Sequence, residues 1–206
     1  NYDLRFEFYP KKSGQIISVS AFYKDLNNAI EQIAGNGQLR SINYANVEKA
    51  TNMGLEFEYR GLLSTIFKND SSSFLNGTTL FTNFSYIKSE VDVSKLNYVE
   101  ARPLQGQSPV IINAGAQYIN QKYNFGVSVS YNYVAKRIII VGNVDERTIW
   151  ENPRHVLDLQ LSKTFKDRVE LKFNVRDILA QNLILYQDIN SNNKFDSFDN
   201  KLEQRE

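Results

Sequence analysis

Cysteine is absent from the chain, so disulfide bonds, thiolate metal sites and cysteine-based catalysis are all excluded. An excess of one charge is absent too, because 24 basic residues balance 23 acidic ones. The chain therefore has no bulk field to attract nucleic acid, and we expect no nucleic-acid partner. No stretch approaches the roughly 18 apolar residues that a membrane-spanning helix needs. Proline and methionine are scarce, at 4 and 1 residues.

Aromatic residues are abundant by contrast, with 12 Tyr, 13 Phe and 1 Trp. Together with frequent Asn and Ser, they are typical of a β-rich protein whose strands end at polar boundaries. The mean hydropathy of −0.43 would suit a water-soluble protein. Strands with one lipid-facing and one polar face also have a low average, so hydropathy alone does not decide between the two.

Apolar and polar residues alternate in a series of segments, and this pattern predicts about eight β-strands. The clearest case is 125–133, where Phe, Val and Tyr alternate with Gly, Ser and Asn. The predicted strands are 2–9, 17–24, 54–61, 78–88, 110–118, 125–133, 154–165 and 169–176. Their lengths are close to the roughly 9–11 residues with which a tilted strand crosses a bilayer.

The connections alternate between short ones and long ones. The short connections are 10–14, 62–77, 120–122 and 166–168, and the long ones are 26–53, 89–109, 135–153 and 178 onward. Outer-membrane barrels have short periplasmic turns and long extracellular loops. We therefore predict an all-β, antiparallel transmembrane β-barrel, with 178–206 as an extracellular loop or tail. The apolar run 138–141 is predicted to be the exposed end of the sixth strand or a β-extension above the membrane.

A soluble antiparallel barrel with a packed interior is the first alternative. Charged side chains on the inward-facing set argue against it, because they cannot fill a dry core unpaired. These residues are Arg5, Glu7, Glu56, Glu58, Arg60, Lys172 and Arg176. A half-exposed sheet with one wet face stays open as a second alternative.

The chain opens directly in a strand-like run, without the charged and apolar regions of a signal peptide. With short turns on the periplasmic side, both of its ends would lie outside the cell. Complete barrels of this kind have an even number of strands and usually keep both termini on the periplasmic side. We therefore expect an excerpt that lacks at least one strand before Asn1 and one after Glu206.

Four segments resemble the late barrel strands and loops of TonB-dependent outer-membrane receptors, particularly those of the Bacteroidetes type. They are RPLQGQSPVIINAGAQY (102–118), NYVAKRIIIVGN (132–143), ENPRHVLDLQLSKTF (151–165) and VRDILAQN (175–182). The resemblance implies a plugged barrel of about 22 strands. Residues 1–206 would form the C-terminal part of that single barrel domain, without its plug and final strand.

The resemblance also implies a function in the bacterial outer membrane. Such a receptor takes up a scarce nutrient (a siderophore, glycan, peptide or cofactor) with energy that TonB relays from the proton gradient. Its partners would be membrane lipid, TonB, the ligand and a surface lipoprotein, and we expect no enzymatic activity. The alternative is a non-transporting barrel, either an adhesin or a barrel enzyme, and the residues upstream of Asn1 would discriminate, since an adhesin needs no plug.

The tail contains a spacing that resembles EF-hand and dockerin calcium loops. Oxygen-bearing side chains fall at loop positions 1, 3, 5, 9 and 12, with a backbone carbonyl at position 7. The candidate Ca²⁺ ligands are Asp188, Asn190, Asn192, Lys194 (through its carbonyl), Asp196 and Asp199. Asn193 stands where such loops usually have glycine, and Asp199 is shorter than the usual Glu. A polar loop without metal is the alternative, and both stay open.

Other candidate residues have simpler interpretations. His155, the single histidine, is predicted to be a surface residue. Glu56 and Glu58 would line a wet lumen and be balanced by Arg60. The loops 27–52 and 89–108 are predicted to capture ligand or form a lid. Aromatic residues near strand ends are predicted to form interfacial girdles: Tyr2, Tyr23, Tyr59, Tyr86, Tyr118, Tyr123, Tyr133 and Phe165.

Overall fold

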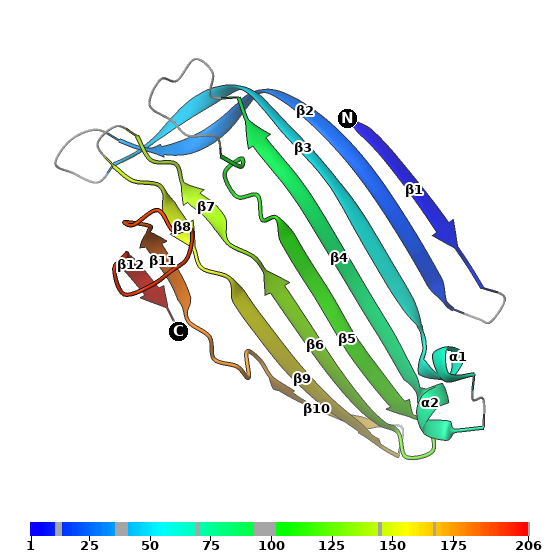
Figure 1. The fold of residues 1–206 in the computed structure, drawn as a ribbon. Coiled ribbons are helices and arrows are strands. Elements are labelled where there is room, and N and C mark those ends of the chain that lie inside the picture. Colours follow the sequence, from blue (N-terminus) through cyan, green and yellow to red (C-terminus); the bar gives the residue numbers. More distant parts are fainter. Residues whose placement is uncertain are drawn as a thin grey trace.

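The computed structural model describes residues 1–10, 14–35, 41–68, 71–92, 102–143, 146–166 and 168–205. Its larger sheet, here called the wall, has eight antiparallel strands in the order β1-β2-β3-β4-β5-β6-β9-β10 (Figure 1). Their bounds are Tyr2–Phe8 (β1), Ile16–Ala34 (β2), Ile42–Leu62 (β3), Thr78–Val91 (β4), Val110–Asn120 (β5), Phe125–Val134 (β6), Arg154–Phe165 (β9) and Val169–Val175 (β10). All eight predicted strands are therefore confirmed, in an open sheet rather than a closed barrel.

The two ends of the wall differ in their connections (Figure 1). At one end, here called the short-turn end, few residues separate β1 from β2, β5 from β6 and β9 from β10, and two short helices lie between β3 and β4, α1 (Leu63–Phe67) and α2 (Ser73–Gly77). The hydroxyl of Ser72 caps α2 by accepting a hydrogen bond from the amide of Leu75 at 3.3 Å. The long-loop end has all the other connections. No helix in the described part of the chain is long and apolar enough to cross a membrane.

The strands β2 and β3 are much longer than predicted, at 19 and 21 residues. The interval 26–53, which we predicted to be a long polar segment, is mostly strand. Its alternation is hard to read because the buried side changes: Ala50 and Val47, three residues apart, are both buried. Asn28 lies nearby in the left-handed region with φ 55°. Period-two reasoning fails where a strand does not keep one face apolar.

A smaller four-stranded sheet, in the order β12-β11-β8-β7, lies at the long-loop end (Figure 1). Its strands are Arg137–Ile140 (β7), Ile149–Glu151 (β8), Leu183–Gln187 (β11) and Asn200–Arg205 (β12). The intervals 135–153 and 178–206 are thus partly strand and not only loop and tail. The predicted β-extension at 138–141 is present as β7. However, Ile138 is fully buried at 0% exposure, so the prediction of an exposed strand end is wrong.

The two sheets are joined at the end of β2. Ile33 and Val141 form a parallel bridge. The amide of Ala34 donates to the carbonyl of Val141 at 2.8 Å, and the amide of Val141 donates to the carbonyl of Gln32 at 3.0 Å. The long-loop end is therefore one hydrogen-bonded structure and not a set of separate loops.

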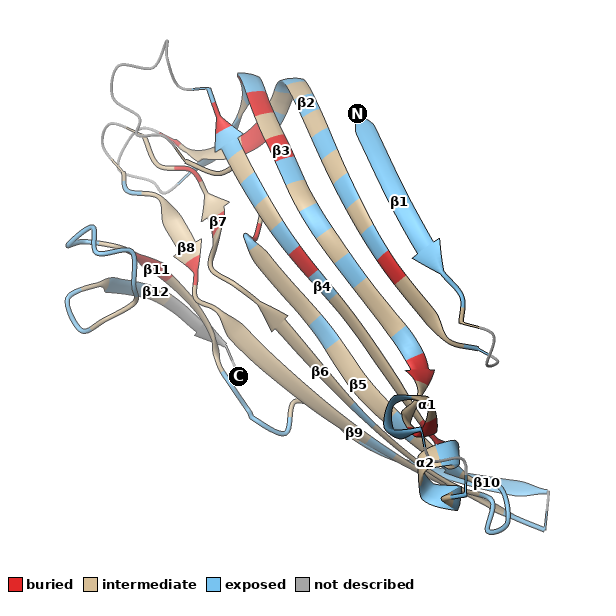
Figure 2. Ribbon diagram, turned by 45° about the vertical axis from the view of Figure 1, so that its right-hand side comes forward, coloured by how far each residue is buried: buried red, intermediate tan, exposed pale blue. Residues whose placement is uncertain are grey.

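Burial is concentrated at the long-loop end (Figure 2). The hydrophobic cluster of the described residues consists of Val47, Ala50 and Val91, with Leu26 and Leu104 packed against it. Along the wall itself, half-buried and exposed residues alternate, and β1 is exposed throughout (Figure 2). The wall is a single layer with no packed interior of its own, which removes the support for a soluble barrel with a dry core.

Candidate functional site

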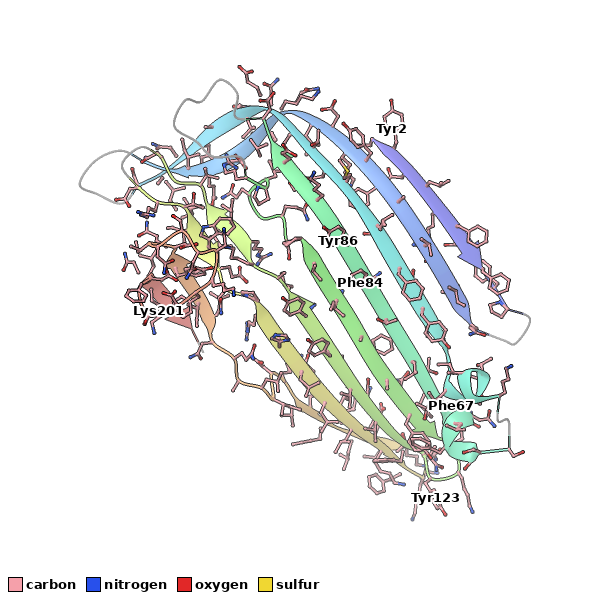
Figure 3. The ribbon with its side chains drawn as sticks, in the orientation of Figure 1. Tyr2, Phe67, Phe84, Tyr86, Tyr123 and Lys201 are labelled. Carbon is pink, nitrogen blue, oxygen red and sulfur yellow. The ribbon has the colours of Figure 1, made fainter. Side chains whose placement is uncertain are left out.

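One face of the wall is apolar across all eight strands. Phe6, Val19, Phe57, Phe84, Ile112 and Tyr133 follow one another in register from β1 to β6. Large apolar side chains on this face are widely exposed, for example Leu4 at 74% and Phe173 at 60%. Figure 3 labels Phe84 and Tyr86, which alternate with Ser85 on β4. A face of this size and composition fits contact with lipid.

Charged residues bound the apolar face at both ends. Beyond Tyr23 and Tyr86 toward the long-loop end, the same face has the ion pair between Lys49 and Asp25, at 3.3 Å. Lys163 lies toward the short-turn end, where its ammonium donates to the carbonyl of Tyr123 and lies 5.8 Å from the ring centroid of Phe165. This is the arrangement by which long basic side chains reach the polar edge of a bilayer. The predicted girdle residues on the strands all lie on this face: Tyr2, Tyr23, Tyr59, Tyr86, Tyr118, Tyr133 and Phe165.

The opposite face is polar. Glu7, Ser18, Glu58, Asn83, Asn113 and Asn132 follow one another in register from β1 to β6. The amide of Asn132 donates to the side-chain oxygen of Asn113 at 2.6 Å. The inward-facing residues of β4 to β6 are uncharged, while charged residues lie on both flanks of them.

Glu58 has a different partner from the one we predicted. Arg5 on β1 donates to Glu58 at 2.7 Å and to Glu7 at 2.6 Å, and Ser18 on the intervening strand donates to Glu58 at 3.4 Å. The cation that the structure places against this carboxylate is thus Arg5, from two strands away, and not Arg60, which we predicted to balance it. That contact depends on the register of three strands and has no signal in the local spacing.

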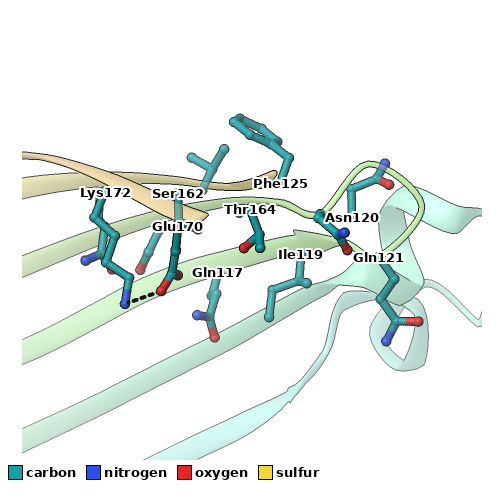
Figure 4. A pocket seen from close by; sticks show the side chains of 14 residues that line it. Gln117, Ile119, Asn120, Gln121, Phe125, Ser162, Thr164, Glu170 and Lys172 are labelled. Atoms are coloured by element: carbon teal, nitrogen blue, oxygen red, sulfur yellow. Dashed lines mark ion pairs between the residues drawn. The ribbon is translucent and has the colours of Figure 1, made fainter. Parts of the chain in front are cut away.

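Shallow hollows follow the polar face, and Figure 4 shows the one near the short-turn end. The hollow in Figure 4 is lined mainly by amide and hydroxyl side chains, including Gln117, Ser162 and Thr164. Lys172 and Glu170 form an ion pair at its edge, at 3.2 Å. These groups can donate and accept hydrogen bonds, which suits contact with water, a polar ligand or another polar protein segment.

The predicted calcium loop folds around its own carboxylates. Asp188 accepts from the backbone amides of Asn192 and Asn193, at 3.2 and 2.8 Å. Asp199 accepts from the amide of Ile189 at 3.0 Å. Asn193 has φ 64°, the left-handed conformation for which such loops use glycine. The structure therefore brings positions 1 and 12 of the loop into one hydrogen-bonded turn.

Asp196 is the most heavily hydrogen-bonded carboxylate in this loop. It accepts from the side-chain amides of Asn190 and Asn192, at 3.0 and 2.7 Å, and from the backbone amide of Phe198 at 2.8 Å. These bonds, with that from Asn190 the largest contribution, hold the pKa of Asp196 below its ordinary value. The amide of Lys194 donates to Asn192 at 2.8 Å. Among the described residues, no three His, Asp or Glu side chains gather closely enough to hold a metal by themselves.

The loop Asp188–Asp199 packs against the smaller sheet. The ring centroids of Tyr186 and Phe195 lie 5.1 Å apart. Lys136 lies 4.1 Å from the ring centroid of Trp150 and donates to the carbonyl of Asn193 at 3.1 Å. Burial raises the pKa of Tyr186 to about 12, with further contributions from the nearby Asp188 and Asp199. Burial also lowers the pKa of Lys136.

His155 is half-buried on the apolar face between two tyrosines. Its Nδ1 lies 2.7 Å from the hydroxyl of Tyr131, and its ring centroid lies 4.6 Å from that of Tyr133. The prediction of a plain surface residue therefore missed both aromatic partners, which come from the neighbouring strand β6. Nothing in the spacing of the single histidine could have indicated them.

An antiparallel wall with a lipid-compatible face on one side and a polar, hollowed face on the other defines an outer-membrane β-barrel segment. Residues 1–182 match the sequence model of the TonB-dependent receptor-like β-barrel. The chain belongs to this family, and it is part of a barrel of the bacterial outer membrane. The polar face is accordingly the lumen face. The Bacteroidetes subtype stays a prediction.

A solved structure supports the same fold. The FrpB iron transporter from Neisseria meningitidis (F3-3 variant) superimposes with a TM-score of 0.56 at 14% sequence identity. The match covers 88% of this chain and 26% of that one, so the chain spans about a quarter of the length of the transporter. A search of the curated proteins returns no match.

Proposed function

We propose that the chain is part of the barrel of a receptor that imports a scarce nutrient across the outer membrane with energy relayed by TonB. The observation that carries the proposal is the polar lumen face, in which uncharged amides and hydroxyls of β4 to β6 lie between charged flanks. The membership of the TonB-dependent family supports it. The short-turn end would face the periplasm and the long-loop end the outside. The nutrient would be a siderophore, glycan, peptide or cofactor, and a surface lipoprotein would assist its capture.

Transport is tested with the full-length receptor in its native cells. Growth on single-nutrient media is compared between wild-type cells, cells that lack the receptor and cells that lack TonB. We expect one nutrient whose limiting concentration rises at least tenfold in both deletion strains. Growth that depends on the receptor but not on TonB would overturn active transport. Loss of surface attachment, with no growth defect in any medium, would favour an adhesin instead.

We further propose that the loop Asp188–Asp199 binds Ca²⁺ and that the ion braces the long-loop end. The turn that gathers Asp188 and Asp199, and the left-handed Asn193, support this. Calcium would replace the amide hydrogens of Asn190 and Asn192 at Asp196, so these two side chains must turn to present oxygen. No catalytic role is assigned to the ion.

Calcium binding is tested by hydrogen exchange of the amides of 188–199 in the full-length receptor. One millimolar Ca²⁺ should slow their exchange at least tenfold, whereas Mg²⁺ should not, because it prefers a smaller, more rigid shell. Asp188→Asn is the test variant, and Asp158→Asn, on the lumen face, is the matched control. Exchange rates that are equal with Ca²⁺ and with a chelator would refute the site.

A further inference from the structure

The segment Arg102–Pro109, here called the strap, directly precedes β5 and lies along the lumen face. Its backbone is bonded to β4 at both ends. The amide of Val91 donates to the carbonyl of Arg102 at 3.0 Å, and the amide of Ile87 donates to the carbonyl of Pro109 at 2.9 Å. Between these points Leu104 packs against the cluster of Val47, Ala50 and Val91. The strap therefore lies inside the long-loop end, against the wall.

A buried ion pair fixes the start of the strap. Glu31 on β2 is only 1% exposed, and the side chain of Arg102 is 10% exposed. The two Nη atoms of Arg102 donate to the two carboxylate oxygens of Glu31, at 2.9 and 2.6 Å. The backbone amide of Gln105 adds a third bond to Glu31 at 2.7 Å. A carboxylate this deeply buried needs such charge-assisted partners, and the planar guanidinium matches it in a way that an ammonium cannot.

Gln105 extends this connection to the smaller sheet. Its side-chain oxygen accepts from the amide of Gln32 at 2.6 Å, and its side-chain nitrogen donates to the carbonyl of Ile139. The amide of Gly106 donates to the carbonyl of Ile138 at 2.9 Å. Gly106 has φ +77°, a conformation that other residues rarely adopt, so this approach to β7 requires glycine. The strap is thus held by β2 on one side and by β7 on the other.

We propose that the pair of Glu31 and Arg102 locks the strap as a fixed inner rim of the barrel, so that this segment narrows the long-loop opening and does not move as a lid. The sequence predicts that 89–108 captures ligand or forms a lid, and within that interval residues 102–108 would then be fixed and not mobile. Only the statement that this opening faces outward rests on the proposed function. The rim itself is a property of the fold.

The test is hydrogen exchange of the full-length receptor in detergent micelles, read at the amides of Leu104, Gln105, Gly106 and Gln107. In the wild type these amides should exchange at least a hundredfold more slowly than in an unstructured peptide. Glu31→Gln should accelerate them at least tenfold. Glu56→Gln, which removes one lumen-facing carboxylate elsewhere on the same hairpin, is the matched control and should leave them within twofold of the wild type.

A conservative variant and a double variant distinguish loss of the contact between Glu31 and Arg102 from a general loss of stability. Arg102→Lys keeps the charge but loses the two-point contact, so its acceleration should be smaller than that of Glu31→Gln. Adding Arg102→Gln to Glu31→Gln should cause no further acceleration, because the two residues act through one contact. Should Glu31→Gln fail to assemble, the comparison of Arg102→Lys with the wild type decides alone, and the strap amides should exchange faster in the variant. Wild-type strap amides that exchange as fast as a free peptide, or rates unchanged by both single variants, would overturn the proposal.

Discussion

The ring of Phe81 on β4 lies over Gly115 on β5, in the space that a side chain at position 115 would occupy. A Cβ at this position would also lie 2.6 Å from the carbonyl oxygen of Val129, a backbone atom that cannot easily move. We predict that Gly115→Ala lowers the free energy of unfolding by about 1–3 kcal/mol, the usual range for overpacking. Urea unfolding of the full-length receptor in detergent measures it. Ala114→Val, on the apolar face, is the control, and equal losses in both variants would contradict the close approach.

The two faces of β4 predict opposite outcomes for neighbouring substitutions. Phe84→Arg places a charge on the apolar face, where arginine costs about 2–4 kcal/mol near the bilayer midplane. Asn83→Arg places the same side chain on the lumen face, where water can solvate it. The first variant should reduce the heat-resistant folded band of the full-length receptor on gels, and the second should not. If both fold equally well, the assignment of the faces is wrong.

Tyr186 predicts a stability change at high pH. Its folded pKa of about 12 lies above the ordinary value of about 10. The contribution of the protonated Tyr186 to the free energy of unfolding is therefore complete below pH 10 and is lost as the pH rises through 12. In wild-type protein the smaller sheet should therefore loosen between about pH 10 and pH 12. Tyr186→Phe should remove this transition. Hydrogen exchange of the β8 and β11 amides measures it.

The hydroxyl of Tyr186 also bears on stability at neutral pH. It is buried and has no hydrogen-bond partner among the described residues. Its removal in Tyr186→Phe should leave stability unchanged or raise it by about 1 kcal/mol, because an unsatisfied polar group is lost while the ring contact with Phe195 remains. A clear loss of stability would mean that the hydroxyl has a bonding partner.

The lowered pKa of Asp196 predicts that the loop 188–199 becomes less ordered at low pH. Hydrogen bonds, above all that from Asn190, hold its folded pKa below the ordinary value of about 3.9. Its contribution to loop order is therefore present above that value and is lost as the pH falls through the folded pKa. Protection of the 188–199 amides should decrease below about pH 4, and Asp196→Asn should weaken this dependence. An unchanged acid profile in the variant would show that other groups control the loop.

The strands of the wall could be predicted from the sequence because two different solvents impose one clear period. A residue such as Phe84 must face lipid while Asn83 faces the lumen, and the alternation follows directly. At the long-loop end the strands no longer lie between lipid and lumen, so apolar and polar residues need not alternate there. The sequence therefore did not indicate that β2 and β3 extend beyond the predicted 17–24 and 54–61. The smaller sheet could not be predicted as a sheet, because its strands come from two separate intervals of the chain, 135–153 and 178–206, of which only 138–141 was expected to be strand.

The contacts in the candidate sites are of two kinds, local ones that the sequence indicates and long-range ones that it does not. The hydrogen bonds around Asp188 and Asp199 are local, so the spacing within twelve residues was enough to indicate a closed loop. The contacts of Arg5 with Glu58, and of Arg102 with Glu31, join residues that are 53 and 71 positions apart. Such pairs depend on strand register and on the path of a connection, which composition and period do not determine.

The strands β7 and β8 are inserted between β6 and β9, yet β6 and β9 pair directly from Val134 with Arg154 to Phe125 with Lys163. An entire hairpin has thus been accommodated without a shift in the neighbouring register. The pairing of β6 with β9 is therefore determined by the two strands themselves and needs no short turn between them. The hairpin of β7 and β8 is instead joined to β2 and to the strap, so a change in its length would act first on the long-loop end and not on the strands that cross the bilayer.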